Sequence, residues 1–128
     1  MTFRQRLVSL FISCLLLPGL SAAEPGLSPD EVRVGMVNAQ SGPAAALGQS
    51  MRNGVQAYFQ RINAAGGVHG RRISLLSFDD GYEPSRTAVH TQSLLKTRQV
   101  FALLGYVGTP TSRTAVPIAQ RAQVPYLF

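Results

Sequence analysis

After residue 30 the sequence alternates short apolar segments with longer segments of helical periodicity. The apolar segments are about four to eight residues long and are bounded by glycine, proline or aspartate, which is typical of buried strands. In the longer segments apolar residues recur three and four positions apart, which places them on one helix face. The expected strands are 31–38, 72–78, 100–104 and 124–128, and the expected helices are 49–65, 84–98 and 110–123. This order predicts an α/β fold in which a parallel βαβαβαβ sheet has helices on both faces, in three layers.

Two details of the expected helices follow from their residues. The apolar residues of the first helix should face inward, and they are Met51, Val55, Tyr58, Phe59 and Ile62. The third helix contains Pro117, which lacks an N–H group and should kink the helix or separate its first turn.

The first 23 residues have the pattern of an export signal. Arg4 contributes to a basic start, the stretch 7–17 is mostly apolar, and small residues up to Ala23 suit cleavage there. The apolar stretch is shorter than the roughly 20 residues that a membrane-spanning helix needs. Because the stretch continues beyond Cys14, we do not expect this cysteine to carry a lipid anchor.

Removal of 23 residues from 128 leaves a chain of 105 residues, 24–128, which is enough for one small domain. This chain has no cysteine, so disulfides and thiolate chemistry are excluded. Two of the twelve Lys and Arg residues leave with the signal, so ten basic and six acidic residues remain and the formal charge is +4. The basic residues are scattered and are not interleaved with aromatic residues, so we expect no nucleic-acid binding.

Three loops should meet where the parallel strands end, because the carboxyl ends of such strands share one edge of the sheet. They are 38–47, 79–83 and 105–111. The first supplies the Ser41 hydroxyl, backbone amides and a small apolar wall that includes Leu47. Ser41 is at least as often a structural loop residue as a ligand contact.

The third loop is the strongest indication of a ligand. Thr109 is expected to cap the third helix and Pro110 to be its first residue, so free amides and partial positive charge would face an anion. Thr109 and Thr111 would add two hydroxyls. The loops together predict a pocket with an anion-binding corner and apolar sides, suited to a carboxylate rather than to catalysis. Tyr106 either stacks on the ligand or packs beneath the loop.

No catalytic or metal-binding set is recognisable in the sequence. It contains no dinucleotide fingerprint, nucleophile elbow or phosphate loop. His69 is expected in a turn and His90 on an exposed helix face, while Asp79 and Asp80 are expected to be turn and cap residues rather than metal ligands. We therefore expect no enzymatic activity, cofactor or metal. The alternative, an exported α/β enzyme, is disfavoured by the lack of catalytic motifs.

Four motifs in the order 41–48, 62–71, 78–84 and 105–112 resemble the periplasmic leucine/isoleucine/valine-binding protein family. Members of that family are substrate-binding components of ABC importers with the type I periplasmic-binding fold, in which two α/β lobes close on a ligand. The resemblance implies a periplasmic protein whose ligand is a small carboxylate such as an amino acid, branched-chain by default, and whose partner is an ABC permease in the inner membrane. An extracellular sensor domain of a receptor with the same fold is the alternative.

The resemblance also implies roles for particular residues. The family's carboxylate contact maps onto Thr109, with Gly108 beside it, and its apolar contacts map onto Leu47 and Val107. Members are several hundred residues long, so the chain corresponds to an incomplete N-terminal lobe over 24–128. We expect a truncated gene product or a fragment of a longer protein.

Overall fold

The computed structural model describes residues 24–127, and four strands alternate with three helices in this range. The predictions of an export signal over 1–23, of its cleavage near Ala23 and of no lipid anchor at Cys14 lie outside the described residues. The elements are β1 (Glu31–Asn38), α1 (Ala45–Ala64), β2 (Arg72–Asp79), α2 (Pro84–Lys96), β3 (Ala102–Leu104), α3 (Thr109–Arg121) and β4 (Tyr126–Leu127). The predicted βαβαβαβ order is therefore confirmed. No helix within 24–127 is long and apolar enough to cross a membrane.

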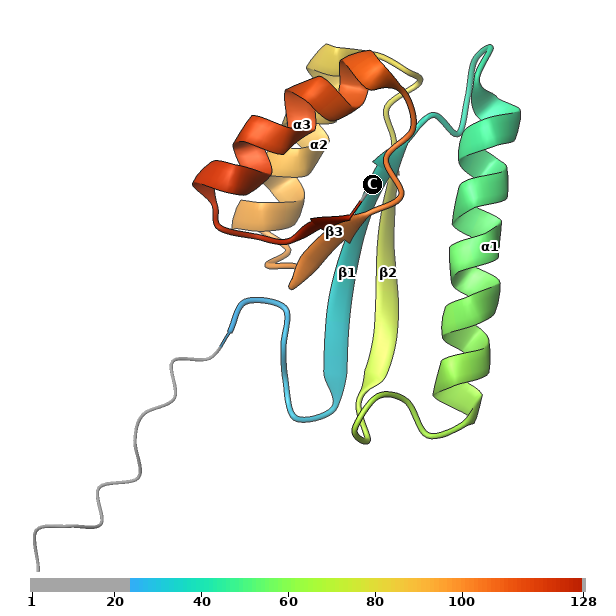
Figure 1. The fold of residues 1–128 in the computed structure, drawn as a ribbon, viewed down its shortest axis with the longest axis vertical. Helices are drawn as coiled ribbons and strands as arrows, with labels where there is room; N and C mark the ends of the chain where they lie inside the picture. The colour runs from blue at the N-terminus through green and yellow to red at the C-terminus, as the bar shows by residue number, and fades with distance from the viewer. Residues whose placement is uncertain (1–23, 128) are drawn as a thin grey trace, which may run out of the picture.

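All four strands run parallel in one sheet with the order β2-β1-β3-β4. β1 pairs with β2 along its whole length of eight residues, from Glu31 beside Arg72 to Asn38 beside Asp79. Only two residue pairs join β1 to β3, and two join β3 to β4. Helix α1 lies on one face of the sheet, and α2 and α3 pack together on the other (Figure 1). The predicted three-layer arrangement is thus present.

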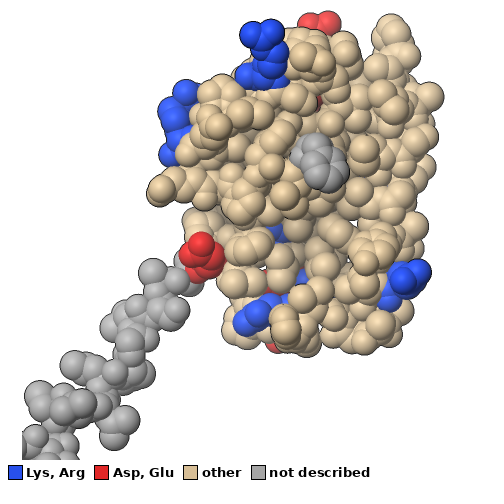
Figure 2. All heavy atoms as spheres, in the orientation of Figure 1, with Lys and Arg blue, Asp and Glu red and all other residues tan. Residues whose placement is uncertain are grey.

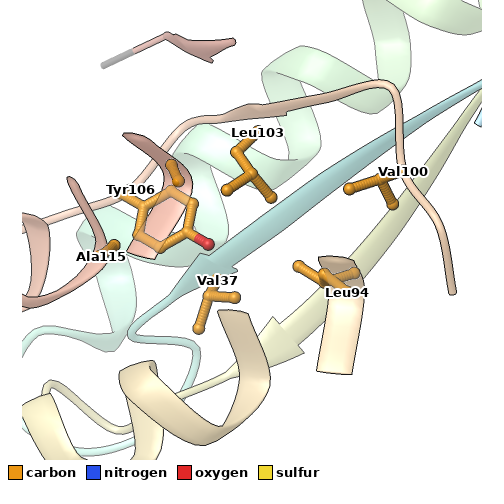
Figure 3. Close-up of a cluster of buried hydrophobic side chains, with 7 residues drawn as sticks. Val37, Leu94, Val100, Leu103, Tyr106 and Ala115 are labelled. Carbon is orange, nitrogen blue, oxygen red and sulfur yellow. The ribbon is translucent and has the colours of Figure 1, made fainter. Parts of the chain in front are cut away.

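The hydrophobic core lies between the sheet and the pair α2 and α3 (Figure 3). Its buried members are Val37, Leu94, Val100, Leu103, Tyr106, Ala115 and Ala119. Ala115 and Ala119 are both fully buried on α3. Because their side chains are small, α3 can approach the sheet and α2 closely.

Helix α1 begins at Ala45, four residues before the expected start at 49. The sequence predicts a loop over 44–48, because this segment follows Gly42 and Pro43 and contains Gly48. The helix needs Gly48 here, because a side chain at this position would overlap the backbone carbonyl of Ala39. The close approach of helix and strand thus explains a glycine that the pattern treats as a breaker.

The expected inward face of α1 is only partly buried. Val55, Phe59 and Ile62 are half-buried, but Met51 is 36% exposed and Tyr58 is 56% exposed. The reason is that the main contacts of α1 with the sheet are to β2. An open apolar groove of about 410 Å³ therefore runs beside α1, and it is lined by Ser50, Met51, Gly54, Val55, Tyr58, Phe59 and Leu104.

Two further details of the helices differ from expectation. Helix α3 is continuous through Pro117, which lies on its exposed side, so the predicted separation of its first turn does not occur. His90 is not an exposed residue but is half-buried, and its ring stacks on Phe78 with 5.1 Å between ring centroids and 13° between ring planes. His69 lies in an exposed turn, as predicted, with a φ of 50°.

Candidate ligand-binding site

A buried asparagine ties the first and third loops together at the carboxyl edge of the sheet. Asn38, the last residue of β1, is fully buried. Its Nδ2 group donates to the carbonyl of Gly48 at 3.2 Å and to the carbonyl of Gly105 at 3.1 Å. The start of α1 and the end of β3 are therefore held together by one side chain, as the shared edge predicts.

Asp79 joins the first loop to the second. Its Oδ1 accepts hydrogen bonds from the backbone amides of Gln40, Ser41 and Gly81 at 2.7, 3.1 and 2.9 Å. Burial raises the pKa of Asp79, but hydrogen bonds from the Ser41 hydroxyl and from these amides outweigh burial and lower the pKa from 3.8 to about 2. Asp79 is therefore an ionised turn residue, and Ser41 of the first loop forms hydrogen bonds to it.

Asp80 anchors the turn that enters α2. It is fully buried, and its carboxylate accepts from the Tyr82 amide at 2.9 Å and from the Thr87 hydroxyl at 2.7 Å. Both aspartates thus hold turns, as predicted, but neither caps α2, whose N-cap is Glu83 without a side-chain capping hydrogen bond. Among the residues that the structure describes, no three His, Cys, Asp or Glu side chains gather as a metal would require.

The third loop differs from the prediction at the helix start. Gly108, with a φ of 100°, is the N-cap of α3, and Thr109 is already the first helical residue without a capping hydrogen bond. The prediction that Thr109 is the N-cap was therefore wrong, because Gly108 adopts the non-helical conformation of the N-cap residue. Thr111 is fully buried, and its hydroxyl donates back toward the carbonyls of Val107 at 2.6 Å and Gly108 at 2.8 Å.

Of the two threonine hydroxyls predicted for the pocket, only that of Thr109 is in an exposed residue. An open surface hollow of about 610 Å³ lies along this side of α3 and is lined by Gly108, Thr109, Ser112, Arg113 and Val116. The cationic Arg113 is one helical turn beyond Thr109. A hydroxyl, a guanidinium and the positive end of a helix thus share one hollow, which is a favourable setting for a small anion.

The other predicted contact residues do not line this hollow. Leu47 is 61% exposed on the first turn of α1, while Val107 is buried beneath the third loop. Tyr106 is also buried, among the core side chains (Figure 3). Its hydroxyl lies 2.8 Å from the Thr91 hydroxyl, and its ring centroid is 4.9 Å from that of Tyr126. Burial raises the pKa of the Tyr106 hydroxyl above its usual range. This environment agrees with the alternative in which Tyr106 packs beneath the loop.

The structure also identifies a residue that the sequence reasoning missed. Tyr82, in the second loop, is 39% exposed and adopts a positive φ of 68°. Its ring lies directly against Gly108: a Cβ atom at that position would be 2.7 Å from Tyr82 Cζ and 2.8 Å from its Oη. The two residues belong to different loops, so no local pattern connects them. The one available signal was an aromatic residue in the turn at the end of a strand.

Basic side chains are dispersed over the surface. In the face that Figure 2 shows, Lys and Arg groups lie apart from one another and form no continuous patch.

Comparison with known proteins identifies the family of this chain. Residues 31–128 match the family model described as periplasmic binding protein. The chain is 29% identical over 99 residues to the Leu/Ile/Val-binding protein BraC3 of Rhizobium johnstonii, which covers 77% of this chain and 26% of the relative.

Two solved structures have the same fold with bound ligands. The branched-chain amino acid transporter substrate-binding protein LivJ of Streptococcus pneumoniae, in complex with isoleucine, has a TM-score of 0.73 and 31% identity, over 76% of this chain and 28% of that one. A solute-binding protein of an ABC transporter from Rhodopseudomonas palustris, in complex with 3,4-dihydroxybenzoic acid, has a TM-score of 0.69 and 29% identity, over 77% and 27% of the two chains.

The chain spans about a quarter of the length of the curated relatives that it matches. Within that span the match covers every strand and helix of the described structure. The chain therefore belongs to the periplasmic binding protein family, of the leucine/isoleucine/valine-binding type.

Proposed function

We propose that this chain is the N-terminal, ligand-recognising part of a periplasmic substrate-binding protein that delivers a small carboxylate to an ABC permease. Residues 24–128 would form an incomplete lobe, exported with a signal that is removed near Ala23. The observation that carries the proposal is the hollow at the start of α3, where Thr109 is exposed in a chain that belongs to this family. The chain would recognise a ligand without transforming it.

The ligand class follows from the groups in the hollow. The Thr109 hydroxyl, the Arg113 guanidinium and the helix start all favour negative charge. Isoleucine and 3,4-dihydroxybenzoic acid, the ligands of the two solved relatives, both carry a carboxylate. We therefore place the carboxylate at Thr109, with Gly108 providing close backbone approach. Leu47, exposed on the first turn of α1, would contribute apolar surface at the same edge of the sheet, and Tyr106, Val107 and Ser41 support the loops.

The proposal predicts a specific loss on substitution of Thr109. Titration of the purified, isotope-labelled protein with isoleucine or benzoate should shift the backbone amide NMR signals of Gly108, Thr109 and Thr111. Thr109→Ala should weaken binding by about 1–3 kcal/mol, because a hydrogen bond to a charged group is lost. Thr109→Ser, which keeps the hydroxyl, should bind like the wild type.

Thr114→Ala is the matched control, because Thr114 is in the same helix but its hydroxyl donates to the Pro110 carbonyl at 3.1 Å. A thermal melt of each variant separates a loss of binding from a loss of folding. If neither ligand shifts the three amide signals in the folded protein, or if Thr109→Ala and Thr114→Ala bind alike, the carboxylate site is not at Thr109.

A further inference from the structure

We propose that Tyr82 is the specificity-determining residue of this site, and that its ring selects carboxylates that carry a flat apolar group over small acids that lack one. The inference rests on the proposed function, because it takes the carboxylate to be bound at Thr109. It concerns a residue from a different loop, whose place beside the site is visible only in the folded structure.

The first step is the position of the ring. A Cβ atom on Gly108 would be 2.7 Å from Tyr82 Cζ and 2.8 Å from Tyr82 Oη, closer than atoms that are not bonded can pack. The ring therefore rests on the backbone of Gly108. Gly108 immediately precedes Thr109, and successive Cα atoms are about 3.8 Å apart. A ligand bound to the Thr109 hydroxyl would therefore lie next to the outer end of the Tyr82 ring.

The second step is that the ring is held where it is. Tyr82 adopts a φ of 68°, which is uncommon for a bulky aromatic residue. Its amide donates at 2.9 Å to the buried Asp80, and the preceding Gly81 amide donates at 2.9 Å to Asp79. Two carboxylates thus hold the backbone of this turn, and the unusual conformation directs the side chain across to the third loop.

The third step is that the ring remains available. Tyr82 is 39% exposed, whereas Tyr106, the aromatic residue predicted from sequence, is 6% exposed and has its hydroxyl bonded to Thr91. A partly exposed aromatic ring on a fixed backbone can pack against a flat or apolar ligand group at little entropic cost. Such a contact requires a ligand with carbon surface next to its carboxylate.

Two probes that share a carboxylate test the inference, namely benzoate and acetate. The dissociation constants of both are measured by NMR titration of the purified protein, followed at the Thr109 amide. We expect the wild type to prefer benzoate, and Tyr82→Asn to lower that preference about two- to tenfold, the range of a lost aromatic contact. Asparagine tolerates a positive φ, so this variant removes the ring without adding backbone strain.

Tyr82→Phe keeps the ring and should keep the preference. Tyr58→Ala is the matched control, since Tyr58 is an exposed tyrosine on α1, outside the site. We also expect nuclear Overhauser contacts between the benzoate protons and the Tyr82 ring.

The possible failures can be told apart. An unchanged ratio of the benzoate and acetate constants in folded Tyr82→Asn overturns the role of Tyr82 and leaves the proposed function standing. Equal weakening of both probes means that Tyr82 only positions the third loop, which also overturns selection by the ring. If neither probe shifts the Thr109 amide in the wild type, the proposed function fails and this inference fails with it.

Discussion

Two glycines of α1 occupy opposite environments, although both lie within one helix. Gly48 is buried, and its Cα faces the backbone of Ala39 so closely that an added methyl group would overlap the carbonyl oxygen. Gly54 has no atom within 4 Å of the place where its Cβ would be. Neither glycine has a positive φ. Space alone therefore decides what a side chain would do at each position.

Alanine at these two positions should change stability in opposite directions. Gly48→Ala should lower the free energy of unfolding by about 3 kcal/mol, because strand and helix must move apart. Gly54→Ala should raise it by about 0.5–1 kcal/mol, because alanine loses less conformational entropy in a helix. Urea unfolding followed by circular dichroism measures both. Equal effects of the two substitutions would contradict the close packing of α1 on Ala39.

Asp79 should make stability depend on pH in the acid range. Its pKa is lowered to about 2 in the folded protein, so its hydrogen bonds contribute fully above the unfolded pKa near 4 and are lost as the pH falls toward 2. The contribution is about 1–2 kcal/mol, after allowance for solvent screening of a side chain that is 31% exposed. Urea unfolding between about pH 5 and pH 2 measures it.

The comparison of variants isolates the effect of this carboxylate from the others. Asp79→Asn should be less stable than the wild type at neutral pH, and the difference should shrink as the pH falls. Asp30→Asn removes an exposed carboxylate whose side chain accepts none of these hydrogen bonds, and it serves as the control. A constant difference between Asp79→Asn and wild type across the range would show that Asp79 does not act through its charge.

At the scale of the elements, α3 is a continuous helix that carries a proline on its exposed side. Pro117 has no N–H group, so the carbonyl of Arg113 lacks its helical partner. Pro117→Ala should restore this hydrogen bond and raise the free energy of unfolding by about 1–2 kcal/mol, reduced by the greater freedom of the unfolded chain.

Pro110, at the start of the same helix, provides the control. Its missing N–H would have no partner in any case, so Pro110→Ala should give no gain and a loss of up to about 1 kcal/mol. Thermal unfolding of both variants makes the comparison. If Pro117→Ala is not stabilising, the helix has already adapted its backbone to the proline.

The elements were largely predictable because each has its own local pattern. β1 matched the expected range 31–38, since its apolar run is bounded by polar residues at both ends. The errors arose where tertiary packing overrides a local signal. The sequence predicts a loop at Gly48 because its contact with Ala39 is invisible in the sequence, and it predicts Thr109 as the cap although Gly108 adopts the conformation that a cap requires.

The candidate site was predictable to the level of loops and only partly to the level of side chains. That the loops meet at one edge follows from parallel strands alone, and Asn38 and Asp79 show how they are joined. Which side chains face the ligand depends on packing between loops distant in sequence. For that reason Tyr106, which belongs to the third loop, lies in the core, whereas Tyr82 crosses from another loop to rest on Gly108.

At the scale of the whole molecule, the pairing of the sheet is unequal from one side to the other. β1 and β2 share a ladder of eight residues, whereas β3 and β4 share two pairs. The amides of Leu103 and Gly105, which donate to Pro125 and Leu127, therefore depend on the shortest pairing in the sheet.

Amide protons in such a region exchange with solvent through local opening, at a lower free energy than the global unfolding that releases the protons of β1. The third loop is attached to this easily opened half, while the second loop follows the long ladder. The second and third loops, which we propose to face the ligand, thus follow parts of the sheet that differ in stability. A ligand that contacts both Thr109 and Tyr82 would link the less stable part of the sheet to the more stable part. It would therefore slow amide hydrogen exchange at Leu103 and Gly105.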